Sequence, residues 1–168
     1  KTAPQSADAA RLAAAVEAAN AAVIEAALNG LGKPGMGCTA TCAYIENDTL
    51  AIAHVGDSRA YLLHEGTLIR VTRDHSYVEE LVDAGEITAD EARVHPNRSV
   101  ITRALGSDPA MYADHFTLHI EEGDRLILCS DGLSSMIPDS DIENIATQSS
   151  TAQICVDNLV DAALAAGG

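Results

Sequence analysis

The spacing of apolar residues along the chain predicts a long helix, a group of strands, short helices, further strands and two final helices. Small apolar residues recur at helical spacing over residues 7–28, with Ser6 as the N-cap and Asn29-Gly30 as the stop. This pattern predicts one continuous helix. We expect its buried stripe to contain Leu12, Val16, Ala19, Val23 and Ala26.

Short apolar runs bounded by turn-forming residues predict strands in the first half of the chain. They are expected at residues 39–45, 50–55, 59–63 and 68–72. Turns rich in Asn, Asp, Gly and Thr join the first pair and the last pair, and such short connections favour antiparallel pairing. We therefore expect residues 38–72 to form one meander.

The pattern changes to short helices over residues 74–98, where Ser76-x-x-Glu79 and Thr88-x-x-Glu91 match the capping box. This segment is expected to be a helical excursion from the sheet. Strand patterns then return at residues 100–104, 114–120 and 125–129.

Two more helices are predicted near the end of the sequence. Ser140-x-x-Glu143 and Ser150-x-x-Gln153 are expected to begin them. The second helix is expected to bury Ala152, Val156, Leu159, Val160 and Ala163.

A chain of 168 residues with 47% hydrophobic content is long enough for one domain with a substantial core. No repeat or low-complexity linker divides it, so we expect residues 1–168 to form a single domain. The order of elements fits an α+β fold better than a βαβ series, because the strand connections are too short for crossovers. A sandwich of antiparallel sheets with helices outside follows.

Charge and cysteine content limit the partners and the compartment. The formal charge of −15 repels nucleic acid and anionic lipid, and no apolar run approaches the roughly 20 residues of a membrane helix. The sequence also lacks a recognisable secretory signal, so we expect a cytoplasmic protein with neither nucleic-acid binding nor membrane insertion. Reduced, mostly buried thiols are expected at Cys38, Cys42, Cys129 and Cys155.

Two carboxylates stand beside glycines at the ends of predicted strands. Asp57 follows Gly56, and Asp131 precedes Gly132. A carboxylate where the backbone can approach closely suits a hard divalent cation, so Asp57 and Asp131 are candidate metal ligands of a metal-assisted enzyme. Each also has an ordinary interpretation, Asp57 as a turn residue that caps backbone amides and Asp131 as a strand terminator.

Neither neighbouring serine, Ser58 or Ser130, has a base close in sequence, so we assign no catalytic nucleophile. The sequence also bears on the roles of two other pairs of residues. His95 and Arg98 either meet a substrate or pack within their own segment. Arg59 and Arg103 are expected to pair with carboxylates rather than hold phosphate.

Six segments occur in the order found in PPM-type metal-dependent serine/threonine phosphatases, and the chain resembles the bacterial branch of this protein phosphatase 2C group. They are Val55-Gly56-Asp57-Ser58-Arg59-Ala60-Tyr61, Asp74-His75-Ser76, Leu81-Val82-Asp83-Ala84-Gly85-Glu86-Ile87, His95-Pro96-x-Arg98, Ile101-Thr102-Arg103-Ala104-Leu105-Gly106 and Leu128-Cys129-Ser130-Asp131-Gly132-Leu133.

The resemblance implies an αββα sandwich of two antiparallel sheets, and Mn²⁺ or Mg²⁺ ions, two or three in a complete domain. Asp131 matches a ligand of a core metal, and Asp57 matches a ligand of an additional, weaker one. Residues 74–98 match a variable flap that influences substrate access. Substrates would be proteins phosphorylated on serine or threonine by a cognate kinase.

The sequence also departs from the family pattern. An upstream Asp-Gly-x-Gly-Gly and a downstream Gly-x-Asp-Asn, which supply further metal ligands in the family, are not found in it. We therefore expect a partial domain with an incomplete metal centre, in which a sheet edge is exposed and favours a dimer. The alternative function is a non-catalytic, PPM-like regulatory or interaction domain.

Overall fold

The computed structural model describes residues 7–168, which divide into two compact units. The first unit runs to Asp57 and resumes over Asp74–Ile120, and the second contains Ser58–Arg73 and Glu121–Gly168. Each unit is described by itself below. The N-cap predicted at Ser6 lies outside the described residues, and the single domain over residues 1–168 stays a prediction.

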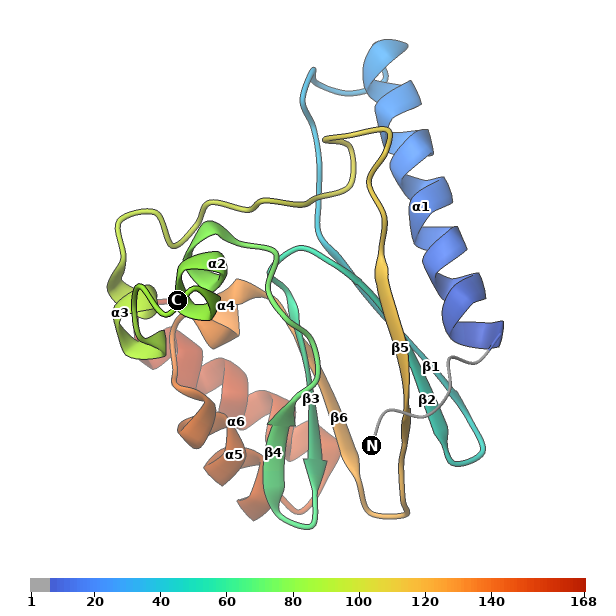
Figure 1. Cartoon of the computed structure of the whole chain (residues 1–168). Coiled ribbons are helices and arrows are strands. Elements are labelled where there is room, and N and C mark those ends of the chain that lie inside the picture. Colours follow the sequence, from blue (N-terminus) through green and yellow to red (C-terminus); the bar gives the residue numbers. More distant parts are fainter. Residues whose placement is uncertain (1–6) are drawn as a thin grey trace. The chain divides into compact units, whose positions relative to one another are not determined.

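The first unit is built on an antiparallel sheet in the order β1-β2-β5. These strands are β1 (Ala40–Glu46), β2 (Thr49–Val55) and β5 (Asp114–His119). Ala40 pairs with Val55 at one end of the β1–β2 hairpin, and Thr49 pairs with His119 across β2 and β5. The helix α1 (Ala7–Leu28) confirms the first predicted helix and lies along this sheet (Figure 1).

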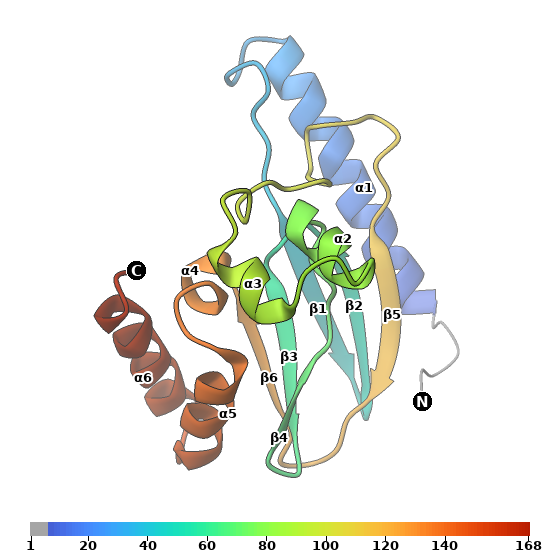
Figure 2. The same cartoon turned by 60° about the vertical axis from the view of Figure 1, so that its left-hand side comes forward.

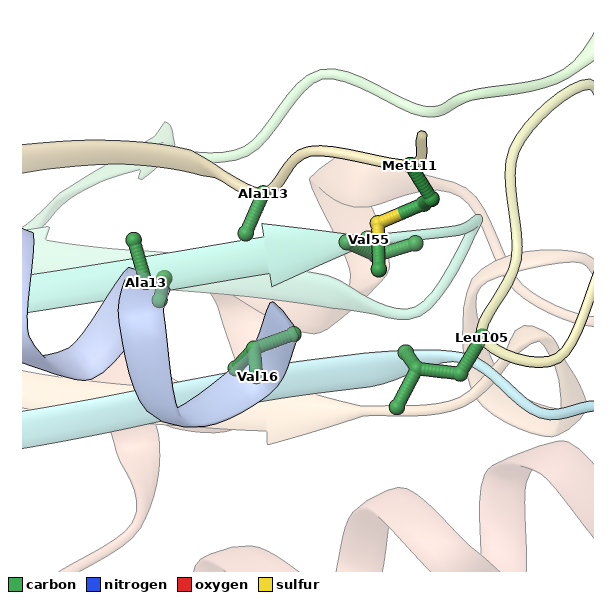
Figure 3. Close-up of a cluster of buried hydrophobic side chains, with 7 residues drawn as sticks. Ala13, Val16, Val55, Leu105, Met111 and Ala113 are labelled. Atoms are coloured by element: carbon green, nitrogen blue, oxygen red, sulfur yellow. The ribbon is translucent and has the colours of Figure 1, made fainter. Parts of the chain in front are cut away.

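The core of the first unit is formed where α1 meets the sheet and the loop that precedes β5. Figure 3 shows the side chains that gather there, which are Ala13, Val16, Val55, Leu105, Met111 and Ala113. The α1 positions that are buried are Ala9, Ala13, Val16 and Asn20.

The expected stripe of α1 is therefore only partly right, because Ala19 is exposed while the polar residue Asn20 is buried. The Asn20 amide explains this burial. Its oxygen accepts from the Gly106 backbone N–H at 2.7 Å, and its nitrogen donates to the Asp108 carbonyl at 2.8 Å. Hydrogen bonds to the loop thus replace hydrophobic contact at this position, which an apolar pattern does not reveal.

The helical excursion of the first unit consists of α2 (Tyr77–Asp83) and α3 (Ala89–Val94). Both predicted N-caps are confirmed, since Ser76 accepts from the Glu79 N–H and Thr88 forms a complete capping box with Glu91. The strand predicted over residues 100–104 is wrong. Among the described residues, this segment forms one isolated bridge, Ser76–Ile101, and a second bridge, Cys38–Leu105, follows directly after it, so the chain meets other backbone here at single points rather than along a ladder.

The second unit contains a smaller antiparallel sheet in the order β4-β3-β6. Its strands are β3 (Arg59–His64), β4 (Thr67–Arg70) and β6 (Arg125–Cys129). The helices are α4 (Asp131–Ser134), α5 (Asp139–Gln148) and α6 (Ala152–Ala165), and Figure 2 shows α5 and α6 side by side next to this sheet.

The meander predicted over residues 38–72 is wrong, although both of its hairpins form. The strand β2 pairs with β5, and β3 pairs with β6, so consecutive strands β2 and β3 belong to different sheets. Both of these pairings join segments that are far apart in sequence. Local turn signals carry no information about them.

The buried face of α6 also differs from the prediction. Cys155, Leu159 and Ala163 are buried, whereas Val156 and Val160 are 54% and 50% exposed. Both choices satisfy helical spacing, and Cys155 and Leu159 are the residues that pack into the core formed with α5 and β3.

The N-caps of the last two helices differ from the prediction as well. Pro138 caps α5 without a side-chain hydrogen bond, and Glu143 instead accepts from the Leu68 backbone N–H at 2.7 Å. Thr151, rather than the neighbouring serine, caps α6.

None of the four cysteines takes part in a disulfide, as predicted, but only Cys155 is buried. The expectation of mostly buried thiols is therefore wrong. Within the described part of the chain, no helix is both long and apolar enough to cross a membrane.

Candidate metal-binding residues

Asp57 lies immediately after β2, at the end of the first segment of unit one, and its side chain is half-buried. The strand reaches Asp57 through Gly56, which is buried and has a φ of 109°. A Cβ at Gly56 would collide with the Thr39 side chain. Only glycine satisfies both the dihedral angle and the space, so the turn that carries Asp57 is closely specified.

His75 holds both backbone groups of Gly56. The Gly56 N–H donates to Nδ1 of His75 at 3.0 Å, and the Gly56 carbonyl accepts from the His75 backbone N–H at 2.8 Å. His75 is anchored in turn, because its carbonyl accepts from the Thr102 N–H at 2.9 Å. The peptide before Asp57 is thus fixed by a residue 19 positions later in the sequence.

A charged pair completes this network on the other side of the imidazole. Nε2 of His75 lies 3.1 Å from a carboxylate oxygen of Asp114, whose other oxygen accepts from Arg103 at 2.6 Å. Arg103 also donates to the Tyr112 hydroxyl at 3.0 Å. Partial burial opposes ionisation of Asp114, but the hydrogen bonds from Arg103 and His75 outweigh it and hold the pKa of this carboxyl below its usual range.

A second histidine packs against the first. His54 is 1% exposed, and its ring centroid lies 4.9 Å from that of His75. Nδ1 of His54 lies 2.9 Å from the Thr41 hydroxyl. The imidazole of His75 is therefore enclosed by packing as well as by hydrogen bonds.

Asp131 occupies a different kind of position in the second unit. It is the first residue of α4, directly after β6, and it is exposed. Its backbone carbonyl accepts from Ser135 N–H at 2.9 Å, and Leu133 N–H bonds to Ser130 at 3.1 Å. Beside it, β6, α4 and α6 line an apolar groove of about 330 Å³.

Both carboxylates fit the donor chemistry of Mn²⁺ or Mg²⁺, because hard cations prefer oxygen ligands at accessible positions. Among residues 7–168, however, no group of three or more His, Cys, Asp or Glu side chains could hold a metal ion. Asp57 and Asp131 thus fit as individual ligands, one in each unit. Their convergence on one metal centre stays a prediction.

The arginines behave as predicted. Arg103 pairs with Asp114, and Arg59 lies 3.5 Å from Asp139. Arg59 also donates to the Tyr61 hydroxyl at 3.0 Å, and Tyr61 in turn donates to Asp139 at 2.9 Å. Burial raises the pKa of Tyr61, so its hydroxyl remains a hydrogen-bond donor at physiological pH.

For His95 and Arg98, the sequence leaves open whether they meet a substrate or pack within their own segment. The structure shows such packing for His95. Its ring centroid lies 6.0 Å from that of Tyr77, which is packing within the segment. Arg98 is exposed.

Comparison with known proteins identifies the family. Residues 8–168 match the family described as Protein phosphatase 2C. The chain belongs to this family. It is 43% identical over 111 residues to the serine/threonine phosphatase stp of Listeria welshimeri, a match that covers 66% of this chain and 44% of that protein. The PstP phosphatase of Mycobacterium tuberculosis is 40% identical over 162 residues, which covers 95% of this chain and 30% of that protein.

Solved structures give the same result. The Staphylococcus aureus phosphatase Stp1 superposes with a TM-score of 0.87 at 33% identity, covering 92% of this chain and 61% of that one. The PstP catalytic domain in complex with two manganese ions superposes with a TM-score of 0.86 at 34% identity, covering 98% and 68%. The predicted fold class is confirmed, with two antiparallel sheets flanked by helices as in these phosphatases. The chain spans about half the length of most curated relatives it matches, and less of PstP.

Motif spacing does not predict the contacts that His75 makes with Gly56 and Asp114. The sequence places His75 in a family segment without assigning it a contact, and it predicts Asp114 only as a strand residue. The Asp74-His75-Ser76 segment was the available signal, but its partner Asp114 is 39 residues further along the chain.

Proposed function

We propose that the protein hydrolyses phosphoserine and phosphothreonine in other proteins in a metal-dependent reaction, with this chain forming part of the catalytic domain. The observation that carries the proposal is the match to the protein phosphatase 2C family over residues 8–168. The named phosphatases among the relatives favour an enzyme over a non-catalytic regulatory domain.

We propose Asp57 and Asp131 as metal ligands. Asp57 would bind through a carboxylate oxygen. The backbone just before Asp57, at Gly56, is held in place by hydrogen bonds to His75. Asp131 would bind through a carboxylate that is open to solvent at the start of α4. When bound, Mn²⁺ or Mg²⁺ ions supply Lewis acidity, which lowers the pKa of water and neutralises charge on phosphoryl oxygens.

The proposed substrates are cytoplasmic proteins phosphorylated by a serine/threonine kinase. Four cysteines without a disulfide suit a reducing compartment. A formal charge of −15 opposes binding to nucleic acid and favours the recruitment of cations. Residues 74–98, with their two short helices, would act as the flap that influences substrate access.

Mn²⁺-dependent hydrolysis of p-nitrophenyl phosphate and of a phosphothreonine peptide by the full-length protein tests this function. We expect turnover that requires Mn²⁺ and falls by at least about 100-fold in Asp131→Ala, because a metal ligand is lost. Asp161→Asn removes an exposed carboxylate on α6 and is the matched control. An inactive parent protein, or full activity in Asp131→Ala, would support the non-catalytic alternative.

We also propose that the exposed edge of the second sheet forms a dimer contact in this chain. The edge strand β6 exposes Leu128 by 47%, and α6 exposes Val156, Val160 and Leu164 by 50% or more. A second copy could cover these apolar side chains. Light scattering of the 168-residue chain should give a dimer that Val160→Asp converts to a monomer. A stable monomer at high concentration would count against the contact.

A further inference from the structure

We infer that His75 is a positioning residue that sets the direction of the Asp57 carboxylate toward its metal ion. The inference rests on the proposed function for the role of Asp57. It goes beyond that function by giving a task to a side chain that is 3% exposed.

The first step is the contact with the turn. Two hydrogen bonds join His75 to both backbone groups of Gly56, the residue directly before Asp57. The φ of 109° at Gly56 leaves the peptide with few alternatives once these bonds form. The direction in which the Asp57 side chain leaves the backbone is therefore set largely by His75.

The second step is the protonation of the ring. The Gly56 N–H donates to Nδ1, so Nδ1 carries no proton and the neutral ring is protonated at Nε2. The Nε2 proton then points to Asp114, which Arg103 also holds. Asp114 thus fixes the tautomer that the Gly56 contact requires, in the way that carboxylates orient histidines in metal sites.

The third step is enclosure. The ring packs on His54, and the backbone of His75 is tied to Thr102. A ring held on several sides cannot follow a displaced turn, so it resists movement of Asp57. A partner that orients a metal ligand in this way typically affects metal affinity by about 10- to 100-fold.

Two amide variants test the Nδ1 contact with Gly56 and the Nε2 contact with Asp114 separately. In His75→Asn, the side-chain oxygen lies near the position of Nδ1 and can still accept from Gly56. In His75→Gln, the longer amide reaches the position of Nε2 and can still bond to Asp114, but no acceptor remains for Gly56. His75→Gln should therefore disturb Asp57, and His75→Asn should preserve its direction.

The measurement is Mn²⁺ binding to the full-length protein, followed by electron paramagnetic resonance of the free ion, beside the rate of hydrolysis. We expect His75→Gln to weaken the Asp57-dependent ion by about 10- to 100-fold, and His75→Asn to weaken it by less than about 10-fold. His119→Gln, at an exposed position on β5, should bind as the wild type does.

A double variant excludes a merely structural effect. Asp57→Asn should remove the same ion, so adding His75→Gln in that background should weaken the remaining ions no further. Wild-type affinity in His75→Gln, equal losses in both amide variants, or a further loss beside Asp57→Asn would each overturn the inference. Because binding is measured directly, a protein that binds Mn²⁺ without hydrolysing phosphoesters would refute the proposed function and still decide the role of His75.

Discussion

The surroundings of Asp57 and Asp131 differ in the kind of interaction that holds each residue in place. Asp57 follows a buried glycine whose backbone is bonded to His75, and a charged pair stands behind that histidine. Asp131 begins a four-residue helix beside an apolar groove, with backbone turn bonds around it. The first residue is placed by polar contacts of a buried side chain, and the second by backbone turn bonds in a short helix whose Leu133 packs on the apolar core of the second unit.

The two regions should therefore respond differently to substitution. Hydrogen bonds to a backbone in a left-handed conformation tolerate almost no change of shape, and charges within the network make it sensitive to pH. Apolar packing responds to lost volume and is indifferent to pH.

Gly56→Ala should be the most destabilising single change. The new methyl group would collide with Thr39, and alanine is strained at a φ of 109°. Together these effects should lower the free energy of unfolding by about 4 kcal/mol, measured by urea denaturation.

The matched control for Gly56→Ala is Gly66→Ala in the β3–β4 turn. Gly66 also has a positive φ, of 79°, but a Cβ there meets no atom within 4 Å. Its cost should be about 1 kcal/mol, from the backbone alone. Equal losses at the two glycines would show that the space around Gly56 is not restrictive.

Leu159→Ala should give the next largest effect, in the packing of the second unit. Leu159 is 4% exposed within the core that α5 and α6 form with β3, so its truncation should cost about 3 kcal/mol. Val160→Ala, one residue further along α6 and 50% exposed, should cost less than about 1 kcal/mol. Thermal unfolding of the two variants compares them, and the reverse order would contradict the observed face of α6.

The same two regions show what could be predicted from the sequence. The long helix α1 and the caps at Ser76 and Thr88 are local, because periodicity and a residue three positions later define them. The pairing of β2 with β5 is not local, and neither is the choice of buried face on α6. On α6, a buried face that contains Val156 and one that contains Cys155 fit helical spacing equally well, so the sequence pattern does not distinguish them.

The candidate site also has parts that the sequence predicts and parts that it does not. Asp57 and Asp131 could be selected because each stands beside a glycine at the end of a strand. The position proposed for His75 behind this site could not be predicted, because it depends on contacts with Gly56 and Asp114, 19 and 39 residues away. No periodicity marks a buried histidine as a partner of a distant turn.

Asp114→Asn should test the charged part of the first unit. It removes the pairing with Arg103 and weakens the contact with His75, but the carboxylate is 39% exposed and therefore partly screened. We expect a loss of about 1 kcal/mol at neutral pH.

The stabilisation that Asp114 provides should depend on pH. The pKa of Asp114 lies below its ordinary value in the folded state, so its contribution is present above pH of about 4 and is lost as pH falls through the folded-state pKa. The difference between Asp114→Asn and the wild type should therefore close in acid. A difference that persists unchanged at pH 2 would mean that the loss is steric rather than electrostatic.

His64 in the second unit should give the smallest effect, and one of opposite sign. Its Nδ1 lies 2.8 Å from Asp124, and this hydrogen bond raises the pKa of His64 above the usual 6.5. A raised pKa means that the stabilisation is complete below about pH 6.5 and is lost as pH rises through the folded-state value. Titration of the His64 ring proton by NMR should show this increase, and Asp124→Asn should return the pKa toward 6.5.

Asp124→Asn is a suitable change because its remaining oxygen can still accept from the Glu121 N–H, as the carboxylate does at 2.9 Å. The turn before β6 should therefore survive while the charge is lost. An unchanged His64 pKa in this variant would show that the ion pair has no effect in solution. If both titrations behave as expected, the charge of Asp114 stabilises the first unit at neutral pH and ceases to do so in acid, whereas the charge of His64 stabilises the second unit in acid and ceases to do so as pH rises through its folded-state pKa. The polar network around Asp57 should therefore retain its charged support at neutral pH.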